Sequence, residues 1–168
     1  MSNPLPDLED IARLLAEICY EPETGVFTRK SRSWNSMPGR VLGSVDRSGY
    51  ARVHFHGTRF LAHRLAWFFV YGAWPSGEID HINGVKSDNR VANLRDVSST
   101  TNKQNQRKAL KNNRTGYLGV FFQKANGLYC AQIKVNHKSR HLGYFKDPET
   151  ASAAYLMAKR AIHEGCTL

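Results

Sequence analysis

Cysteine and long apolar runs are scarce in this chain of 168 residues. The three cysteines, Cys19, Cys130 and Cys166, lie far apart and form no Cys-x-x-Cys pair. This spacing argues against a zinc knuckle and against a framework of paired disulfides. No run of about 18 apolar residues occurs, so a membrane span is not expected. Residues 1–4 carry no charged leader, so secretion is not expected. The spacing of the cysteines also fits a reduced setting, and we therefore expect a cytoplasmic protein.

Acidic residues are scarce in the C-terminal part of the chain. Residues 1–102 hold 12 Lys and Arg against 11 Asp and Glu, a balance of +1. Residues 103–168 hold 12 against 3, a balance of +9, which is nearly all of the net charge of +10. This bias is typical of a module that binds a polyanion such as nucleic acid. A basic surface kept for solubility is the alternative explanation.

The first 75 residues predict a small α+β element. Strand candidates at residues 26–28, 41–45 and 50–55 are followed by a hairpin to 59–61 across His56-Gly57. A helix over residues 62–71 is expected to stop at Gly72. An earlier helix with Asp7 as N-cap is expected to end at Glu21–Gly25. Its apolar face comprises Leu8, Ile11, Leu14, Leu15 and Ile18.

Residues 79–108 predict a strand, a turn at Asn83-Gly84, an irregular loop, a strand near 94–97, and a helix. Ser98 or Ser99 would cap that helix and place Asn102 within its first turns. In this ββα order the end of the first strand lies beside the start of the helix. Asp80 and Asn102 are then expected to reach one ion.

The C-terminal part predicts a second sheet. Residues 106–115 are polar and basic without apolar periodicity, which indicates a linker. Strands are expected from residue 116 to 122, over 129–135 and over 140–145, with a turn at 136–138. Asp147 and Pro148 begin a helix that runs to Gly165. This helix would cover one face of the sheet, and Lys and Arg side chains would occupy the other.

The stretch Glu78–Gly84, followed by Asn93-Leu94-Arg95 and by Asn102, resembles the HNH endonucleases. The resemblance runs from about residue 78 to 105 and is strongest for the homing and phage-encoded branch, where Asn often replaces the last His. It implies that His81 is the general base and that Asn93 braces its loop. It also implies that Asp80 and Asn102 bind one Mg²⁺ or Mn²⁺ ion, with Asn105 as a second-tier site residue.

These residue types suit phosphodiester hydrolysis. A neutral imidazole is an effective base near pH 7, and Mg²⁺ prefers hard oxygen ligands such as a carboxylate and an amide. Taken singly, Asp80-His81 also fits a surface turn, Asn93 a loop-to-strand transition, and Asn102 a neighbour of a helix cap. Their joint spacing favours the site.

The motif His63-Arg64-Leu65 also precedes the nuclease motif in phage HNH proteins. We expect a structural role, with Leu65 and Trp67 packing on the core and Arg64 near the backbone. His63 as a catalytic residue is the weaker alternative.

Residues 116–168 resemble the ethylene-response-factor (Apetala-type) DNA-binding domain, which also occurs fused to HNH nucleases. The resemblance implies the sheet-and-helix fold, but four departures put the plant domain's base preference in doubt. Leu118 and Phe121 stand where that domain usually has Arg, and Tyr129 and His141 replace its sheet tryptophans. The resemblance rests on Tyr117-x-Gly119-Val120, Ala131-x-Ile133, Leu142-Gly143-x-Phe145 and Ala151-x-x-Ala154-Tyr155.

The sequence thus predicts an α+β protein with a ββα-metal nuclease core and a three-stranded antiparallel sheet packed on one helix. The expected divisions are an N-terminal extension (1–75), the HNH core (76–108), a basic linker (109–115) and the Apetala-type domain (116–168). Arg90 and Arg95 fit either phosphate contacts or ordinary surface charge. The other expected DNA contacts are Lys103, Arg107, Lys108, Lys111, Arg114, Lys124, Lys134 and Arg140.

The expected function is metal-dependent, site-directed cleavage of double-stranded DNA, without a small-molecule cofactor. The setting would be the cytoplasm of a host cell, with the protein encoded by a phage or a mobile element. A DNA-binding regulator with a decayed site is the alternative, which the intact His81 disfavours. A nonspecific nuclease toxin is disfavoured because a separate recognition module would be superfluous.

Overall fold

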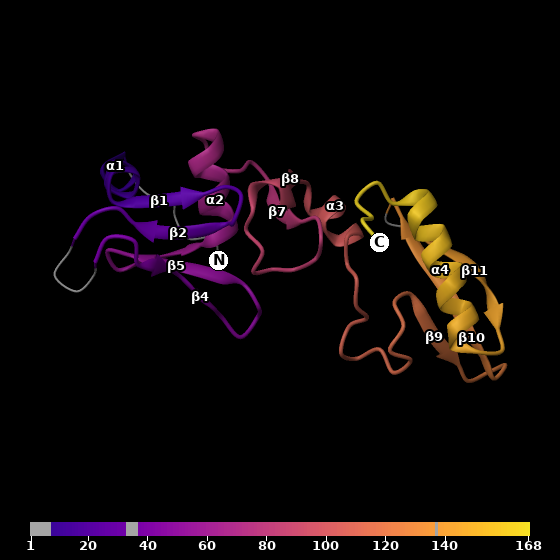
Figure 1. The fold of residues 1–168 in the computed structure, drawn as a ribbon. Coiled ribbons are helices and arrows are strands. Elements are labelled where there is room, and N and C mark those ends of the chain that lie inside the picture. Colours follow the sequence, from indigo (N-terminus) through magenta and orange to yellow (C-terminus); the bar gives the residue numbers. More distant parts are fainter. Residues whose placement is uncertain (1–7, 33–36, 137) are drawn as a thin grey trace. The chain divides into compact units, whose positions relative to one another are not determined.

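The computed structural model describes residues 8–32, 37–136 and 138–168, and the chain divides into the units Met1–Val97 and Ser98–Leu168 (Figure 1). Both units mix helices and strands. None of the helices in these ranges has the length and apolar character that a membrane span requires.

The described part of the N-terminal unit contains small antiparallel sheets. One has the order β1-β2-β3, a second the order β4-β5-β6, and β7 pairs with β8. The bounds are α1 Leu8–Glu17, β1 Ile18–Glu21, β2 Val26–Arg29, β3 Val41–Leu42, β4 Ser44–Val45, β5 Ala51–Phe55, β6 Thr58–Leu61, α2 Ala62–Tyr71, β7 Glu78–His81, the 3₁₀ turn η1 Val91–Asn93, and β8 Leu94–Val97.

The first helix is shorter than the sequence predicts. Helix α1 ends at Glu17, and Ile18 begins strand β1, which pairs with β2 in a hairpin. Buried Ile18 and Tyr20 alternate with two exposed residues, a period of two that suits a strand. Leu15 is 45% exposed, so it does not belong to the buried face. The expected cap Asp7 lies outside the described residues.

The strand expected over 41–45 is also wrong as a single element. Gly43, with φ of +113°, separates β3, which pairs with β2, from β4, which pairs with β5. L-residues rarely adopt that conformation, so the glycine lets the chain pass from one sheet to the next.

The hairpin at His56-Gly57 and the helix that follows it are confirmed. Both turn residues have positive φ (44° and 80°), the signature of a type I′ turn between β5 and β6. Helix α2 ends where Gly72 takes a left-handed conformation and its N–H donates to the Phe68 carbonyl.

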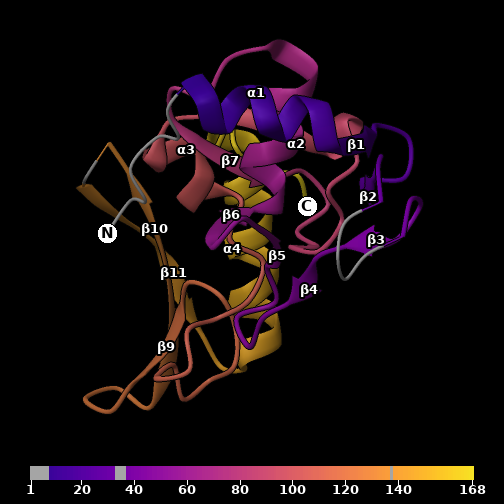
Figure 2. The ribbon, with the colours of Figure 1, turned by 90° about the vertical axis from the view of Figure 1, so that its left-hand side faces the viewer.

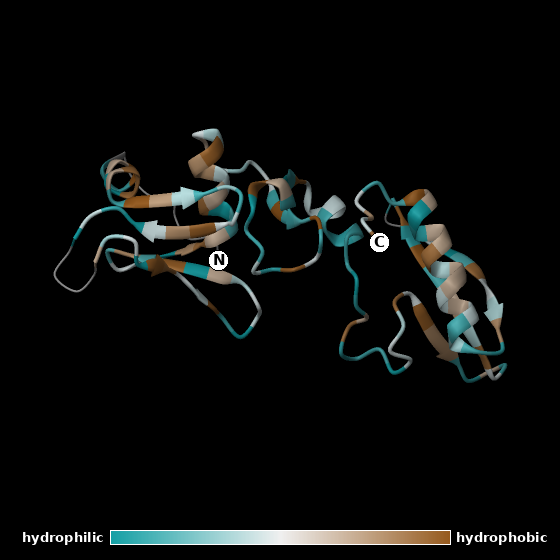
Figure 3. Ribbon diagram, in the orientation of Figure 1, coloured by the Kyte–Doolittle hydropathy of each residue, from teal (hydrophilic) through white to brown (hydrophobic). Residues whose placement is uncertain are grey.

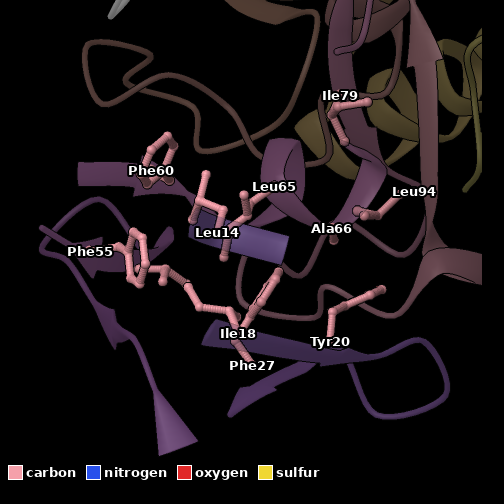
Figure 4. Packing of buried hydrophobic residues seen from close by; sticks show 12 residues of the cluster. Leu14, Ile18, Tyr20, Phe27, Phe55, Phe60, Leu65, Ala66, Ile79 and Leu94 are labelled. Atoms are coloured by element: carbon pink, nitrogen blue, oxygen red, sulfur yellow. The ribbon is translucent and has the colours of Figure 1, made fainter. Parts of the chain in front are cut away.

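The N-terminal core joins the first helices and sheets to the β7–β8 pair. Leu14 and Leu65 are fully buried, and Ile79 and Leu94 belong to the same cluster (Figure 4). The last two come from β7 and β8, respectively. Burying a Leu or Ile side chain stabilises a fold by roughly 1.5–3 kcal/mol, so this core also fixes the strand that ends in His81.

The C-terminal unit contains two helices and one sheet among its described residues. The sheet has the order β11-β10-β9, and α4 lies along one face of it (Figure 2). Ser98 accepts a hydrogen bond from the Thr101 N–H at the start of α3, and Asp147 does the same for Thr150 at the start of α4. The bounds are α3 Ser99–Gln104, β9 Val120–Gln123, β10 Leu128–Val135, β11 Lys138–Phe145 and α4 Pro148–Ile162.

The outer face of this sheet carries aromatic side chains where the sequence predicts mainly Lys and Arg. Val120, Ala131 and Ile133 pack against α4, and alternation along the strands gives the opposite face to Phe121, Cys130 and Tyr144, which lie in one cross-strand row. Arg140 pairs with Ile133 and so belongs to the α4 side. Among the described strand residues of this sheet, Lys134 is the one Lys or Arg on the outer face. It alternates along β10 with Ile133 and Val135, which pack toward α4.

The segment between α3 and β9 is mostly hydrophilic (Figure 3) and has no regular helix or strand. It is nevertheless tied down. The Asn113 amide donates to the carbonyls of Tyr117 and Val120, at 2.8 and 3.1 Å, and the Lys159 ammonium donates to the Gln106 carbonyl. The division of the chain at a linker over 109–115 remains a prediction.

Gly119 allows the turn before β9 to approach α4. It has φ of +69°, and a Cβ there would overlap the Tyr155 ring, whereas Gly127 has φ of +68° with nothing within 4 Å. The backbone strain of an alanine, roughly 1–2 kcal/mol, is therefore the same at both positions. We expect Gly119→Ala to lower the free energy of unfolding of the C-terminal unit by about 1–3 kcal/mol more than Gly127→Ala. Urea unfolding followed by circular dichroism measures the difference. Equal losses would show that the Tyr155 ring moves aside.

Candidate functional site

The loop between β7 and β8 is held closed by Asn93. Its side-chain oxygen accepts from the Asn83 N–H at 2.9 Å, and its amide donates to the Asp88 carbonyl at 2.8 Å. The backbone adds a bond from the Ile82 N–H to the Asn93 carbonyl at 2.9 Å. Asn93 is 7% exposed. A buried amide bonded at both ends fixes the backbone that leaves His81.

A second asparagine, Asn89, contacts the His81 ring. The Asn89 amide donates to the Ser87 carbonyl at 3.2 Å, which turns its oxygen toward His81 Nε2 at 3.3 Å. An amide oxygen only accepts hydrogen bonds, so the neutral ring carries its proton on Nε2. The lone pair of the neutral imidazole is then on Nδ1. Asn89 is 4% exposed.

The β1–β2 hairpin fixes the segment that carries Asn89. The Tyr20 hydroxyl donates to the Asn89 carbonyl at 2.7 Å, and the Val91 N–H donates to the Pro22 carbonyl at 3.2 Å. A Cβ on Gly25, which has φ of +73°, would lie 2.6 Å from the Arg90 nitrogen. Only glycine permits so close an approach, so the hairpin turn and this loop pack backbone against backbone. Burial raises the pKa of Tyr20 to about 12, so its hydroxyl stays a donor.

His81 lies in an aromatic environment. The His63 ring meets it edge-on with centroids 5.1 Å apart, and the Tyr50 ring lies 6.2 Å away. Burial lowers the pKa of His81, opposed by the contact with Asn89 and by the charge of Asp80. Burial likewise lowers the pKa of His63 to about 3, and the neighbouring His81 adds to this. Both rings are therefore neutral at pH 7.

Asp80, directly before His81, is ion-paired with Arg95 across the β7–β8 ladder. Arg95 Nε and Nη2 both donate to one oxygen of the carboxylate, at 2.9 and 2.7 Å. The Asp80 side chain is 7% exposed. The guanidinium orients this carboxylate and balances its charge.

Arg90, the other arginine expected at phosphate, is also held by a carboxylate. Its Nε and Nη2 donate to the two oxygens of Asp88 at 2.8 and 2.6 Å. These bonds lower the pKa of Asp88 to about 2. The pair lies at the surface, with the Arg90 side chain 51% exposed.

Asn102 and Asn105 belong to the C-terminal unit. Asn102 lies in α3 and is half-buried. Asn105, the C-cap of α3, is 5% exposed, and its oxygen accepts from the Thr167 hydroxyl. The structure thus brings Asp80, His81, Asn93 and Arg95 together in one unit, and α3 with both asparagines belongs to the other.

Most of the cations expected to contact DNA are exposed. Arg107 differs, because its guanidinium donates to the carbonyl and the hydroxyl of Thr167 at 2.9 and 2.6 Å. The exposed ones are Lys103, Lys108, Lys111, Arg114, Lys124, Lys134 and Arg140.

The packing expected of Leu65 and Trp67 and the backbone contact expected of Arg64 are confirmed. Leu65 is fully buried, Trp67 packs against the core, and Arg64 donates to the Gly77 carbonyl at 3.1 Å. Sequence reasoning missed Asn89 and Tyr20. The signal for Asn89 was weak, because an asparagine in a polar loop is ordinary, and its burial depends on the distant β1–β2 hairpin.

The donor chemistry of the expected ligands fits a hard divalent cation. A carboxylate from Asp80 and an amide from Asn102 are oxygen donors, and Mg²⁺ keeps several waters beside a small protein share. Within the described residues, no group of three or more His, Cys, Asp or Glu that could hold a metal occurs. A metal site built from such a cluster is therefore not found in that part of the chain.

The low pKa of His63 predicts a loss of stability in acid. The unfolded chain protonates this residue near pH 6.5, whereas the folded chain does so near pH 3. Stability is therefore full above pH 6.5 and falls as the pH drops toward 3, by about 2 kcal/mol between pH 7.5 and 5. We expect His63→Leu to reduce this loss and His54→Leu, at an exposed position, to keep it. Urea titrations at the two pH values test this. An unchanged slope in His63→Leu would contradict it.

Residues 60–107 match the family of HNH endonucleases. The match begins in β6, includes α2, β7, β8 and α3, and covers the loop tied by Asn93. It spans less than a third of the chain. No curated protein and no solved structure matches the chain. The braced loop and the buried His81 thus lie within an HNH endonuclease domain at residues 60–107.

Proposed function

We propose that this chain is a metal-dependent, site-directed DNA endonuclease of the HNH homing type. In this proposal β7, β8 and α3 form a ββα-metal core, and residues 116–168 are an Apetala-type DNA-binding domain. The observation that carries it is the setting of His81. Its ring is buried and contacts Asn89, and the loop that follows it is closed by Asn93.

His81 is the general base in this mechanism. Burial lowers its pKa, so the imidazole is neutral at pH 7, and because the Nε2 proton is directed at Asn89, the lone pair that takes up a proton is that of Nδ1. A water molecule gives this proton to Nδ1 as its oxygen attacks the phosphorus. Asn93 and Asn89 keep the ring and its loop in one geometry, which reduces the entropy lost on reaching the transition state.

Asp80 and Asn102 are the proposed ligands of one Mg²⁺ or Mn²⁺ ion. Such an ion, when bound, stabilises the charge on the phosphorane and on the departing 3′ oxygen. Arg95 positions the Asp80 carboxylate through two hydrogen bonds to one oxygen. Asn105, buried against Thr167, is a positioning residue that supports the C-terminal end of α3.

The duplex is held by positive charge that is concentrated after residue 102. The balance of +9 there, against +1 before it, supports binding through phosphates with release of counterions. The exposed lysines and arginines of the segment after α3 and of the sheet provide these contacts.

A DNA-binding regulator with a decayed nuclease site is the second candidate. The ion pair between Arg95 and Asp80 favours it, because a guanidinium neutralises the carboxylate that would attract a cation. Plasmid DNA incubated with the chain and Mg²⁺ or Mn²⁺ decides between the two. Nicked or linear product supports the nuclease, and intact plasmid under conditions of full binding supports the regulator.

Replacing the proposed base should separate cleavage from binding. We expect His81→Ala to slow plasmid cleavage by about 10²–10⁴-fold, the usual contribution of a general base. DNA affinity should stay within about twofold, since binding depends on phosphate contacts elsewhere. His54→Ala, at an exposed histidine of β5, is the matched control and should cleave normally. Cleavage by His81→Ala at the rate of the control would remove His81 from the mechanism.

The proposed ligands should set the requirement for metal. Asp80→Asn keeps the shape of the side chain but removes its charge, and an amide binds a hard cation less strongly than a carboxylate. We therefore expect it to raise the Mg²⁺ concentration for half-maximal cleavage more than Asn102→Ala does. Rates measured over a Mg²⁺ titration give both values, and EDTA should stop the reaction. Cleavage that continues in EDTA would overturn the metal assignment.

A further inference from the structure

The C-terminal unit contains a groove at the start of strand β9. It has a volume of about 720 Å³, within the range of roughly 300–1,000 Å³ typical of ligand pockets. One wall comes from the segment between Gln106 and Thr115, and the other comes from β9 and the middle of β10. Strand β9 pairs only with Leu128–Ala131 of β10, and its first residue, Val120, pairs with Ala131, so the groove opens where this short strand begins.

The side chains of the groove favour an anionic, aromatic occupant. Arg114, Lys124 and Lys134 line it, and its lining contains no Asp or Glu. Phe121 also lines it, and this ring is 44% exposed. An exposed aromatic ring beside cations is the combination that binds a nucleic acid strand by stacking on bases and pairing with phosphates.

The loop wall is held in place by its own hydrogen bonds. The Asn113 amide donates to the carbonyls of Tyr117 and Val120, and the Thr115 hydroxyl donates to the Val120 carbonyl at 2.9 Å. A wall ordered before binding lowers the entropy lost on association.

An added peptide strand is a poorer occupant. The backbone of β10 beyond Ala131, where β9 no longer pairs with it, could pair with such a strand only if its outward groups were available. The Gln132 N–H already donates to the Gly119 carbonyl at 2.9 Å, and the Lys134 carbonyl accepts from His163 Nε2 at 2.9 Å. This edge is therefore closed to strand addition.

We propose that this groove binds an unpaired stretch of DNA, with a base stacked on Phe121 and phosphates at Arg114, Lys124 and Lys134. The choice of DNA rests on the proposed nuclease function. Bases inside a duplex are stacked on each other and offer no face to a protein ring, so the occupant is a strand opened or frayed from a duplex. The groove thus uses three of the cations proposed to contact DNA, and the Phe121 ring is what distinguishes the binding of an unpaired strand from that of a duplex.

Binding of fluorescein-labelled dT12 to the full chain tests this. His81→Ala and EDTA prevent cleavage, and fluorescence anisotropy gives the affinity. We expect Phe121→Ala to weaken binding about 10-fold, as loss of one stacking contact does, and Phe121→Trp to restore it. Lys134→Gln should flatten the slope of log affinity against log salt by about 0.7. Binding of a 12-base-pair duplex should stay within about twofold in Phe121→Ala.

Tyr144→Ala is the matched control. This ring is 48% exposed and lies in the same cross-strand row as Phe121, but it does not line the groove. The groove assignment would be overturned if Phe121→Ala kept its affinity for dT12. It would also be overturned if Tyr144→Ala lost as much dT12 affinity, or if Phe121→Ala lost as much affinity for the duplex. Tighter binding of rU12 than of dT12 would overturn the choice of DNA. If the wild-type chain cuts no plasmid but binds dT12 through Phe121, the nuclease proposal is refuted and the proposal that the groove binds an unpaired strand still stands.

Discussion

The contact of the β1–β2 hairpin with the loop before η1 is the constraint on which the candidate site depends. The Tyr20 hydroxyl holds the Asn89 carbonyl, and glycine at position 25 lets the two backbones meet. Asn89 in turn sets the proton on His81 Nε2, and Asn93 closes the same loop from inside. A residue 61 positions before His81 therefore helps to decide which ring nitrogen carries the lone pair. In the proposed mechanism, the β1–β2 hairpin therefore contributes to the chemistry without containing a reacting group.

Much of the fold could be predicted where local rules act alone. The His56-Gly57 turn and the stop of α2 at Gly72 follow from positive φ angles that few residues adopt. The start of α4 follows from the Asp147 side-chain cap and from the fixed φ of Pro148. Strand β1 was misread as helix because Ile18 continues the helical period of Leu14 while also fitting the period of a strand. Pairing with β2, which local sequence does not encode, decided between the two.

The candidate site can be proposed from residue spacing, whereas the contacts that hold its side chains in place cannot. Asp80, His81 and Asn93 stand out because separated residues agree with a known pattern. Asn89 has no such signal, and the partner that Arg95 finds in Asp80 depends on the register of β7 and β8. The outer face of the C-terminal sheet was misjudged for the same reason. Net charge shows how many cations a segment holds, whereas the register places Arg140 on the α4 side and aromatic rings on the other.

The last residues of the chain have a consequence for engineering by domain exchange. Gly165 lies against the Thr101 carbonyl, and its N–H donates to the Gln104 side chain at 3.0 Å. Thr167 holds both Asn105 and Arg107. A chimera that kept residues 1–108 and received a foreign DNA-binding module would lose every one of these contacts at the end of α3. The recipient module must therefore bring its own support for that helix, or the graft must retain the native C-terminal tail.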